Sequence, residues 1–327
     1  MESEYDIAIA GGGIAGLTAG LTAARLGRKT LILTGDVPGG QLLSIAKVDG
    51  FPGFPEGIPG YDLCPITQEQ ASAAGAVFEA NELTSLEPHE SRWRLTTGGN
   101  EAASVAALVI ATGARLKELE IPGAVRLTGK GVSHCASCDA PLLRGRVAAV
   151  IGGGDSAMQE ALTLAEFAAR VFLLHRGEAL SGQAAYRAQV KDNPKIELRL
   201  GCEVEEILGD DHVTGLRVRD RHRGAVSDLE AAGVFPYIGL RPNSDFLEGR
   251  LALDPRGAIL TDGSMRTKLS GICAVGAVRS GWGGRAVLSA GEGGAAALAV
   301  DAYLQDGHWR EPGNRREEAD VIEVTHG

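Results

Sequence analysis

The segment Gly11-Gly12-Gly13-Ile14-Ala15-Gly16 decides the fold of the N-terminal part of this chain. It follows the apolar run Tyr5–Ala10, which is typical of a buried parallel strand, and it opens the helical pattern of Ile14–Leu26. The apolar run Lys29–Leu33 predicts the next strand. Glycines between strand and helix let the backbone approach a pyrophosphate at the helix N-terminus. The segment therefore predicts a βαβ unit that binds a dinucleotide.

The same pattern recurs at Gly152-Gly153-Gly154-Asp155-Ser156-Ala157. A strand is expected before it over Arg146–Ile151, a helix over Ser156–Ala169, and a second strand over Val171–Leu174. A glycine-rich spacing alone is weak evidence, but both copies stand between an apolar strand and a helix, which is the required context. The repeat implies two nucleotide-binding domains.

Further apolar runs indicate how these domains are ordered along the chain. Val105–Ile110 ends in Ala111-Thr112-Gly113, Gly233–Ile238 ends in Gly239, and Ile272–Val275 leads through Gly276 to a small-residue helix over Ala286–Tyr303. The sequence thus predicts an α/β fold with two Rossmann-like dinucleotide-binding domains, a nicotinamide domain inserted in a split FAD domain. The expected bounds are residues 1–115 and 246–327 for the FAD-binding domain and 116–245 for the NAD(P)-binding domain, with a disordered tail after Gln305.

Composition restricts the function further. A chain of 327 residues fits two domains, with 44% apolar residues and no run long enough to span a bilayer. The net charge of −10 argues against nucleic acid as a partner. The acidic N-terminus runs directly into a strand, which predicts the absence of a signal peptide. Five cysteines do not form a disulfide framework, so a cytoplasmic location is expected.

Cys135-Ala136-Ser137-Cys138 stands shortly before the second glycine-rich segment. A redox-capable Cys-x-x-Cys in a chain with two nucleotide sites makes an electron route from nicotinamide through flavin to a disulfide. The pair could instead be half of a zinc site, but Cys64, Cys202 and Cys273 are isolated and expected to be buried, so no metal is predicted. Asp139 could protonate a leaving thiolate or serve as a helix cap.

The ends of the second strands differ between the two copies. The first ends in Thr34-Gly35, without the usual acid for a ribose, whereas the second ends in His175-Arg176. A cation at that position suits the 2′-phosphate of NADP, although Glu178 offsets the charge and a solvated arginine is a common alternative.

The chain resembles the low-molecular-weight thioredoxin reductase family over nearly its whole length. The matching segments are Gly11–Gly16, Gly39–Leu42, Phe51–Gly53, Ala111–Gly113, Gly131–Asp139, Gly152–Ala157, His175-Arg176, Ile238-Gly239, Pro242-Asn243 and Ser289–Gly291. The resemblance implies FAD in the first domain, a nicotinamide cofactor in the second, and a homodimer. The His175-Arg176 pair favours NADPH as that nicotinamide cofactor, with NADH as an alternative. The resemblance assigns Cys138 to face the flavin and Cys135 to attack the external substrate. The adjacency of Asp139 to Cys138 agrees with these roles, and Asp139 is expected to be the third catalytic residue as a general acid.

The site residues expected on this basis form two cofactor sets. FAD is expected to contact Gly11, Gly13, Gly16, Gln41, Ala111, Thr112, Gly113, Gly276, Arg285 and Ala286. The nicotinamide cofactor is expected at Gly152, Gly154, Asp155, Ser156, Ala157, His175 and Arg176. Because the Cys pair and the nicotinamide site share one domain and both must reach the flavin, the inserted domain is expected to rotate, with hinges near residues 114–120 and 240–245.

Several positions depart from the family pattern. Ala277 stands where the family has the Asp of its Gly-Asp, Gly284-Arg285-Ala286 stands for Arg-Gln-Ala, and Gly50 replaces an Asn. In the nicotinamide site two family arginines appear as Gly177 and Ser181. After Asp139, Ala140-Pro141-Leu142-Leu143 replaces a segment that often carries a glycine and aromatics for docking thioredoxin.

These observations predict a FAD-dependent thiol–disulfide oxidoreductase whose partner is a thioredoxin-like protein or a small dithiol or disulfide. The lost aromatics predict weak turnover with a generic thioredoxin, unless leucines replace them as anchors. One alternative is a dithiol oxidase that forms a disulfide in a small natural-product molecule with FAD and oxygen or NADP⁺. A second is a non-catalytic redox-sensing flavoprotein, supported by Ala277 and Arg285. The direction of electron flow follows reduction potentials, which residues alone do not give.

Overall fold

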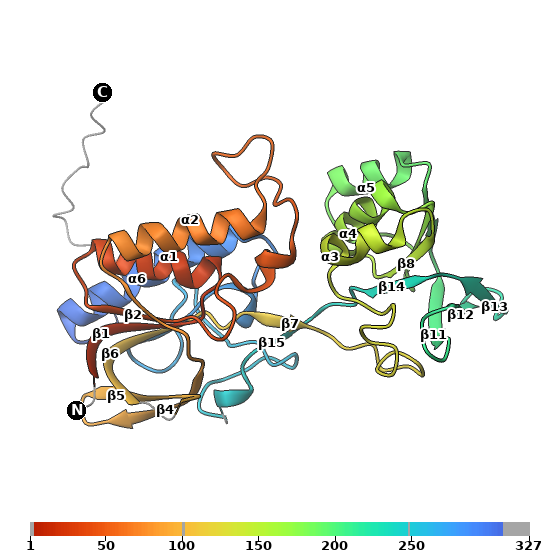
Figure 1. Ribbon diagram of the computed structural model, residues 1–327. Helices are drawn as coiled ribbons and strands as arrows, with labels where there is room; N and C mark the ends of the chain where they lie inside the picture. Colours follow the sequence, from red (N-terminus) through yellow and green to blue (C-terminus); the bar gives the residue numbers. More distant parts are fainter. Residues whose placement is uncertain (1–2, 100–101, 248, 310–327) are drawn as a thin grey trace.

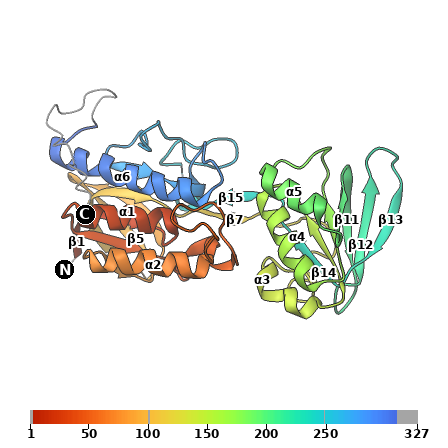
Figure 2. The same ribbon diagram turned by 90° about the horizontal axis from the view of Figure 1, so that it is seen from above.

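The computed structural model describes residues 3–99, 102–247 and 249–309. Two α/β units lie side by side, and the short strands β7 (Ala114–Leu116) and β15 (Leu240–Pro242) carry the chain from one unit to the other and back (Figure 1). Figure 2 shows the two units from above, with β7 and β15 between them. The predicted split arrangement, with one α/β unit inserted in the other, is confirmed by the order of the strands in the sheets.

The first unit is built on a sheet of seven strands. Parallel strands run in the order β3-β2-β1-β6, β16 pairs with the end of β6, and the hairpin β5-β4 pairs antiparallel with its beginning. The strands are β1 (Ser3–Ala10), β2 (Thr30–Leu33), β3 (Val77–Glu79), β4 (Leu83–His89), β5 (Arg92–Thr97), β6 (Ala102–Ile110) and β16 (Ile272–Ala274).

Helices cover one face of this sheet (Figure 1). They are α1 (Ile14–Arg25), α2 (Gly60–Ala73) and α6 (Ala286–Asp306), with short 3₁₀ turns η1 (Gly40–Ser44), η3 (Asp245–Leu247) and η4 (Gly276–Val278). Alanines and glycines let α1 and α6 approach closely, since a side chain at Gly293 would overlap the carbonyl oxygen of Ala15. The close contact carries the N-terminal end of α6 to the β1–α1 turn.

The second unit has three layers. A parallel sheet in the order β10-β9-β8-β14 lies between helices on one face and the antiparallel sheet β11-β12-β13 on the other. Its helices are α3 (Ala136–Asp139), α4 (Asp155–Phe167) and α5 (Ala184–Asp192), with the 3₁₀ turn η2 (Ala140–Leu143). Its strands are β8 (Val147–Ile151), β9 (Arg170–Leu174), β10 (Ile196–Arg199), β11 (Cys202–Leu208), β12 (Gly215–Asp220), β13 (Val226–Glu230) and β14 (Gly233–Pro236).

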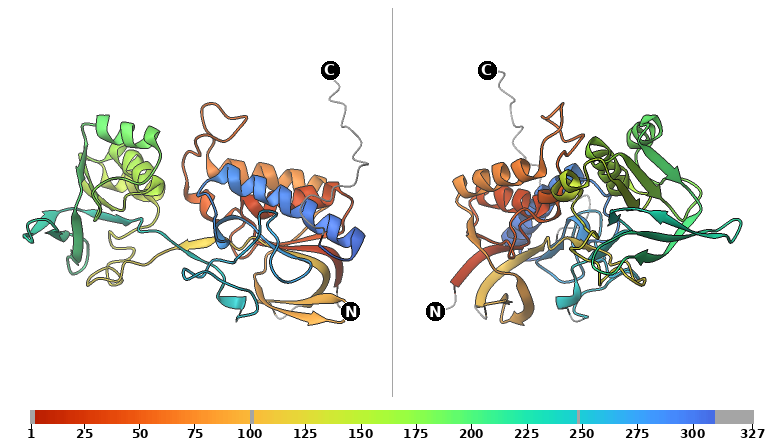
Figure 3. Two further views of the ribbon diagram at one scale, coloured as in Figure 1. Left: turned by 180° about the vertical axis from the view of Figure 1, so that it is seen from behind. Right: turned by 45° about the vertical axis from the view of Figure 1, so that its right-hand side comes forward.

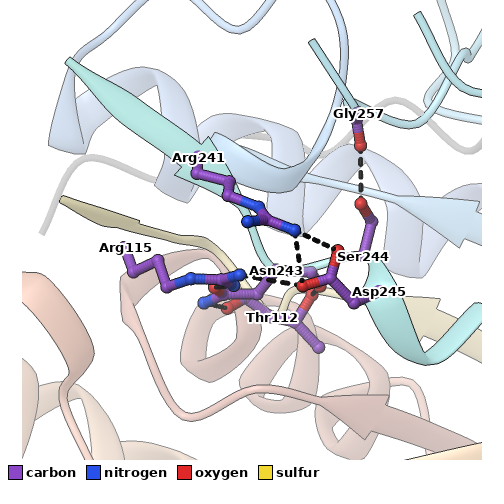
Figure 4. Close-up of polar contacts among 7 residues, drawn as sticks. All are labelled: Thr112, Arg115, Arg241, Asn243, Ser244, Asp245 and Gly257. Carbon is purple, nitrogen blue, oxygen red and sulfur yellow. Dashed lines mark hydrogen bonds and ion pairs between the residues drawn. The ribbon is translucent and has the colours of Figure 1, made fainter. Parts of the chain in front are cut away.

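The two segments in which the chain passes between the units, at β7 and β15, are called the crossings below. Polar contacts join the two crossings (Figure 4). The guanidinium of Arg115 lies 2.8 Å from the carboxylate of Asp245, which also pairs with Arg241 at 3.1 Å. Asn243 donates from its amide to the Thr112 carbonyl at 2.9 Å, and the Thr112 hydroxyl donates to the Asn243 carbonyl at 2.7 Å. The hydrogen bonds from Arg115 and Arg241 lower the pKa of the Asp245 carboxyl. Because these ion pairs of Asp245 are exposed to solvent, they contribute little to the free energy of unfolding. Their role is to fix the position of one crossing relative to the other.

No helix among the described residues is both long and apolar enough to cross a bilayer. The disorder predicted for the tail concerns mainly residues 310–327, which lie outside the described residues, and α6 itself ends at Asp306.

Candidate active site

A cavity of about 860 Å³ opens between the two units and is lined by residues of both. Its volume falls within the range of cofactor and ligand sites. The structure brings together here many residues that the sequence assigned to two separate sites. Those that line the cavity are Gly11, Gly13, Gln41, Ala111, Thr112, Gly113, Gly276, Arg285 and Ala286 from the FAD set, with Asp155 and Ser156 from the nicotinamide set.

The β1–α1 turn fits the phosphates of a dinucleotide. Gly13 is the N-cap of α1, no side chain caps the helix, and its first turn holds no acidic residue, so the first amides are available to an anion. Gly11 has φ +126°, and a side chain there would overlap the carbonyl oxygen of Ala111. At Gly13, by contrast, a Cβ would meet no atom within 4 Å. The backbone thus forms a cradle that is open toward the cavity.

Some cavity residues were missed by sequence reasoning. Asp36 lies beyond the end of β2 and lines the cavity, so a carboxylate is present near the position where Thr34-Gly35 had indicated none. Its signal was present in the sequence, a few residues later than expected. Trp282 also lines the cavity and donates from its indole nitrogen to the Ser289 hydroxyl at 2.8 Å. No pattern in the sequence pointed to Trp282.

Some of the positions that depart from the family pattern line the cavity, whereas Gly177, Ser181 and residues 140–143 do not. Gly50, Ala277 and Gly284 all line the cavity. The turn at Gly276 is held by Glu292, whose carboxylate accepts from the Gly276 amide at 2.7 Å and pairs with Arg279 at 3.0 Å. Ala277, the next residue of η4, lines the cavity beside this turn.

The N-terminus of α4 brings the second glycine-rich segment to the cavity. Asp155 accepts a hydrogen bond from the Gln183 amide at 2.6 Å and forms an ion pair with Arg285 of the first unit. Partial burial raises the pKa of Asp155, but the hydrogen bonds from Gln183 and Arg285 outweigh it and leave the pKa below its usual value. The contact was not predicted, because the sequence assigned Asp155 and Arg285 to different cofactors.

The remaining residues of the expected sets lie outside the cavity lining. They are Gly16, Gly152, Gly154, Ala157, His175 and Arg176, together with Cys135, Cys138 and Asp139. Arg176 is exposed beyond the end of β9, where its carbonyl accepts a hydrogen bond from the Arg221 guanidinium at 3.0 Å. A Cβ at Gly154 would meet no atom within 4 Å, as at Gly13.

Cys135 and Cys138 form a disulfide with a Cα–Cα distance of 5.3 Å. Cys135 is the N-cap of α3 and its sulfur accepts from the Cys138 amide at 3.2 Å, whereas Cys138 is exposed. Asp139 ends α3 and is also the N-cap residue of the 3₁₀ turn η2, although its side chain makes no capping hydrogen bond there. The Ser137 hydroxyl donates to the Ser44 carbonyl at 3.2 Å, which places α3 beside η1 of the first unit. Figure 3 shows the two units from two further sides.

The other three cysteines are free and buried, as expected. Burial raises the pKa of the Cys64 thiol to about 11, and it also raises the pKa of Cys202 and Cys273. Such thiols are poor nucleophiles. Within the part of the chain that the structure describes, no group of three His, Cys, Asp or Glu side chains could hold a metal ion.

Comparisons with known proteins agree with this geometry. The family model for pyridine nucleotide-disulphide oxidoreductases matches residues 5–299. The chain is 38% identical over 304 residues to a thioredoxin reductase of Chlamydia pneumoniae, covering 90% of this chain and 97% of the relative. It is 34% identical over 304 residues to that of Treponema pallidum, covering 93% and 98%. The crystal structure of Lactococcus lactis thioredoxin reductase in the FR conformation superposes with a TM-score of 0.88 at 34% identity, covering 92% of this chain and 99% of that one.

The fold and the site define a two-domain flavoprotein that carries a redox-active disulfide. The chain belongs to the pyridine nucleotide-disulphide oxidoreductase family. It is a FAD-dependent thiol–disulfide oxidoreductase, and its cofactors are FAD and NADPH.

Proposed function

We propose that this protein passes electrons from NADPH through FAD and the Cys135–Cys138 disulfide to the disulfide of a thioredoxin-like protein. The observation that carries the proposal is the exposed Cys138 on a unit whose second glycine-rich segment reaches the cavity through Asp155 and Ser156. The relatives named thioredoxin reductase support the choice of partner. When bound, FAD takes a hydride equivalent from the nicotinamide and supplies two electrons to a disulfide.

The proposed residue roles follow the two glycine-rich turns and the Cys pair. In the FAD site, Gly11, Gly13 and Gly16 shape the pyrophosphate cradle, with Gln41, Ala111–Gly113, Gly276, Arg285 and Ala286 around it. In the NADPH site, Gly152, Gly154 and Ala157 shape the second cradle, Asp155 and Ser156 stand at its mouth, and His175 and Arg176 bind the 2′-phosphate. Cys138 takes electrons from the flavin, and Cys135 attacks the disulfide of the partner. Asp139 acts as the general acid that protonates the leaving thiolate. The proposed domains are 1–115 with 246–327, and 116–245.

The disulfide must move to reach the flavin, because Asp155 and Ser156, rather than the cysteines, line the cavity here. We therefore include a rotation of the second unit about the crossings at β7 and β15. The contacts that break in this rotation join α4 and α5 to the first unit. They are the Arg285–Asp155 ion pair, the hydrogen bond from the Gln159 amide to the Lys47 carbonyl, and the Tyr186 hydroxyl bound to Asp49 at 3.4 Å.

The surface next to the Cys pair supports a protein partner. Leu142, four residues after Cys138, is 74% exposed, whereas Leu143 is buried in the core behind α3. An exposed leucine beside a reactive disulfide can act as an apolar anchor in place of the missing aromatics. We also propose that the protein forms a homodimer. Exposed apolar residues on α2 and α6, such as Tyr61, Ile66 and Leu298, support this assembly. The three free thiols support a cytoplasmic location.

Leu142→Ser is expected to raise KM for thioredoxin about tenfold, since truncating an interface anchor costs about 1–2 kcal/mol. The rate of flavin reduction by NADPH should stay unchanged. The assay is NADPH oxidation coupled to thioredoxin reduction. Val226→Ser is the matched control, because Val226 is also an exposed apolar residue but belongs to β13, on the sheet opposite α3. If Leu142→Ser and Val226→Ser had the same KM for thioredoxin, Leu142 would not belong to the interface with the partner. Oxygen consumption with a small dithiol, without thioredoxin turnover, would instead favour the dithiol oxidase.

Arg176→Ala is expected to raise KM for NADPH about tenfold or more and to leave KM for NADH nearly unchanged. The reason is the loss of one charged hydrogen bond to the 2′-phosphate, which costs roughly 1.5–3 kcal/mol. Steady-state kinetics with both nucleotides measure the effect. Arg170→Ala, at the opposite end of β9, is the control, since Arg170 pairs with Glu197 instead. Equal effects of Arg176→Ala on both nucleotides would show that this residue does not read the phosphate.

A further inference from the structure

A carboxylate is buried on α4 directly behind the cysteine helix. Glu160 is 3% exposed and shares its helix face with Ala157, Ala161 and Leu164, which are fully buried in the apolar core under α3. Its Oε2 atom has no hydrogen-bond partner among the described residues. A buried carboxylate in apolar surroundings is costly in its charged form unless it is fully paired. Neither of the cofactor sites nor the proposed electron route uses Glu160.

The polar groups near Glu160 connect it with the segment that carries the disulfide. The amide of Ala136, the residue after Cys135, and the hydroxyl of Tyr237 both lower the pKa of the Glu160 carboxyl by hydrogen bonding. The Tyr237 hydroxyl in turn donates to the carbonyl of His134 at 3.0 Å, and the Nδ1 atom of His134 is a second buried polar atom without a partner in the described chain. Tyr237 and His134 also line the cavity. A short polar cluster thus connects α4, the N-terminus of α3 and the cavity.

The other elements packed on α4 bring few charges to this place. The titratable or redox-active groups of α3 and of the two residues before it are His134, the Cys135–Cys138 pair and Asp139. The turn after β14 contributes Tyr237, and α5 contributes Tyr186, while η2 and β8 carry no titratable side chain. The charged residues of α5, β9 and β10 are Arg187, Lys191, Asp192, Arg170, Glu197 and Arg199; the first three are exposed and the last three pair with one another.

The surroundings of Glu160 place its titration near neutral pH. Burial raises the pKa of Glu160 to about 7, against the lowering by the Ala136 amide and the Tyr237 hydroxyl. The disulfide beside it carries no charge, whereas the reduced pair carries a thiolate. A new negative charge so close to a carboxylate disfavours its ionised form and raises its pKa further. Reduction of the pair and protonation of Glu160 are therefore linked, and each favours the other.

We propose that Glu160 takes up a proton when the Cys135–Cys138 disulfide is reduced, and so sets the potential of the pair. Two electrons, supplied by the flavin, break the S–S bond and leave two thiolates. One thiolate takes a proton from solvent, the other stays charged, and a second proton from solvent binds the Glu160 carboxylate. Glu160 acts through its charge on the pair and contacts neither substrate nor cofactor. This inference rests on the proposed electron route through the pair.

The test is the midpoint potential of the pair against pH in the FAD-loaded wild type and in Glu160→Gln. For a two-electron couple a tenfold change in equilibrium is about 30 mV, so each proton taken up adds about 30 mV per pH unit to the slope. Between about pH 7 and 8.5 the wild-type slope should be steeper than that of Glu160→Gln by up to this amount. The variant, which mimics protonated Glu160, should have the higher potential there. Below pH 6 the two potentials should coincide, since wild-type Glu160 is then protonated in both redox states.

Glu166→Gln is the matched control, since Glu166 lies on the same helix but is exposed, and it should follow the wild type at every pH. A second measurement uses the native chain: infrared difference spectra at pH 8 should show a protonated carboxyl band on reduction. Identical slopes in wild type and Glu160→Gln, an offset equal at every pH, or the absence of that band would overturn the inference. A pair that accepts no electrons from the flavin would instead overturn the proposed function itself.

Discussion

Replacing either Cys135 or Cys138 by serine lowers NADPH-dependent disulfide turnover at least about a thousandfold, while NADPH still bleaches the flavin at the wild-type rate. The pair acts as a unit, because a disulfide cannot form with one sulfur missing, and losing one member of a catalytic unit costs about as much as losing all. Stopped-flow absorbance follows flavin reduction, and a coupled thioredoxin assay follows turnover. Cys202→Ser is the control, since Cys202 is free and buried. A single-serine variant with near-wild-type turnover would exclude the pair from the electron route.

The two variants should also separate the roles of the sulfurs. If Cys138 faces the flavin after rotation, Cys135→Ser leaves a Cys138 thiolate that produces a long-wavelength absorbance band, and Cys138→Ser does not. Asp139 is adjacent to Cys138, which agrees with this order. The opposite pattern would exchange the roles. A band in neither variant would argue against disulfide chemistry at this pair.

Gly13→Glu is expected to give a folded, colourless protein without FAD. A side chain at Gly13 meets no protein atom within 4 Å, so it extends into the space for the phosphates without disturbing the fold. It also places a negative charge at the helix N-terminus that would hold an anion. Flavin absorbance per protein and a melting curve measure the two effects. Stoichiometric flavin in the purified variant would refute the assignment of this turn.

Gly154→Glu is the matched variant for the second turn. Gly154 is the N-cap of α4, and a side chain there is equally free of protein atoms. The protein should therefore stay yellow and lose reduction of the flavin by NADPH, while dithionite still reduces it. Loss of flavin from Gly154→Glu would show that the two turns do not serve separate cofactors.

Local sequence was sufficient to predict the two βαβ units. The strands predicted over Tyr5–Ala10 and Val171–Leu174 are present as Ser3–Ala10 and Arg170–Leu174, and the helix predicted over Ala286–Tyr303 ends three residues later, at Asp306. Buried parallel strands are continuous apolar runs, and the glycines lie within a few residues of the helix they open, so the signal is local. The antiparallel strands β4 and β11–β13 were not predicted, because their half-exposed sequences mix apolar and charged residues without a clear period.

The sequence by itself determined the fold class, the two cradles and the redox pair, since each depends on residues close together in the chain. Only the tertiary structure decided which residues of the two units contact one another. Asp155 and Arg285, 130 residues apart, pair across the two units because the orientation of α4 toward α6 depends on how the crossings at β7 and β15 set one unit against the other. Glu160 reads in sequence as an ordinary helical residue. Its burial behind Cys135 depends on α3 packing over α4, which no local pattern encodes.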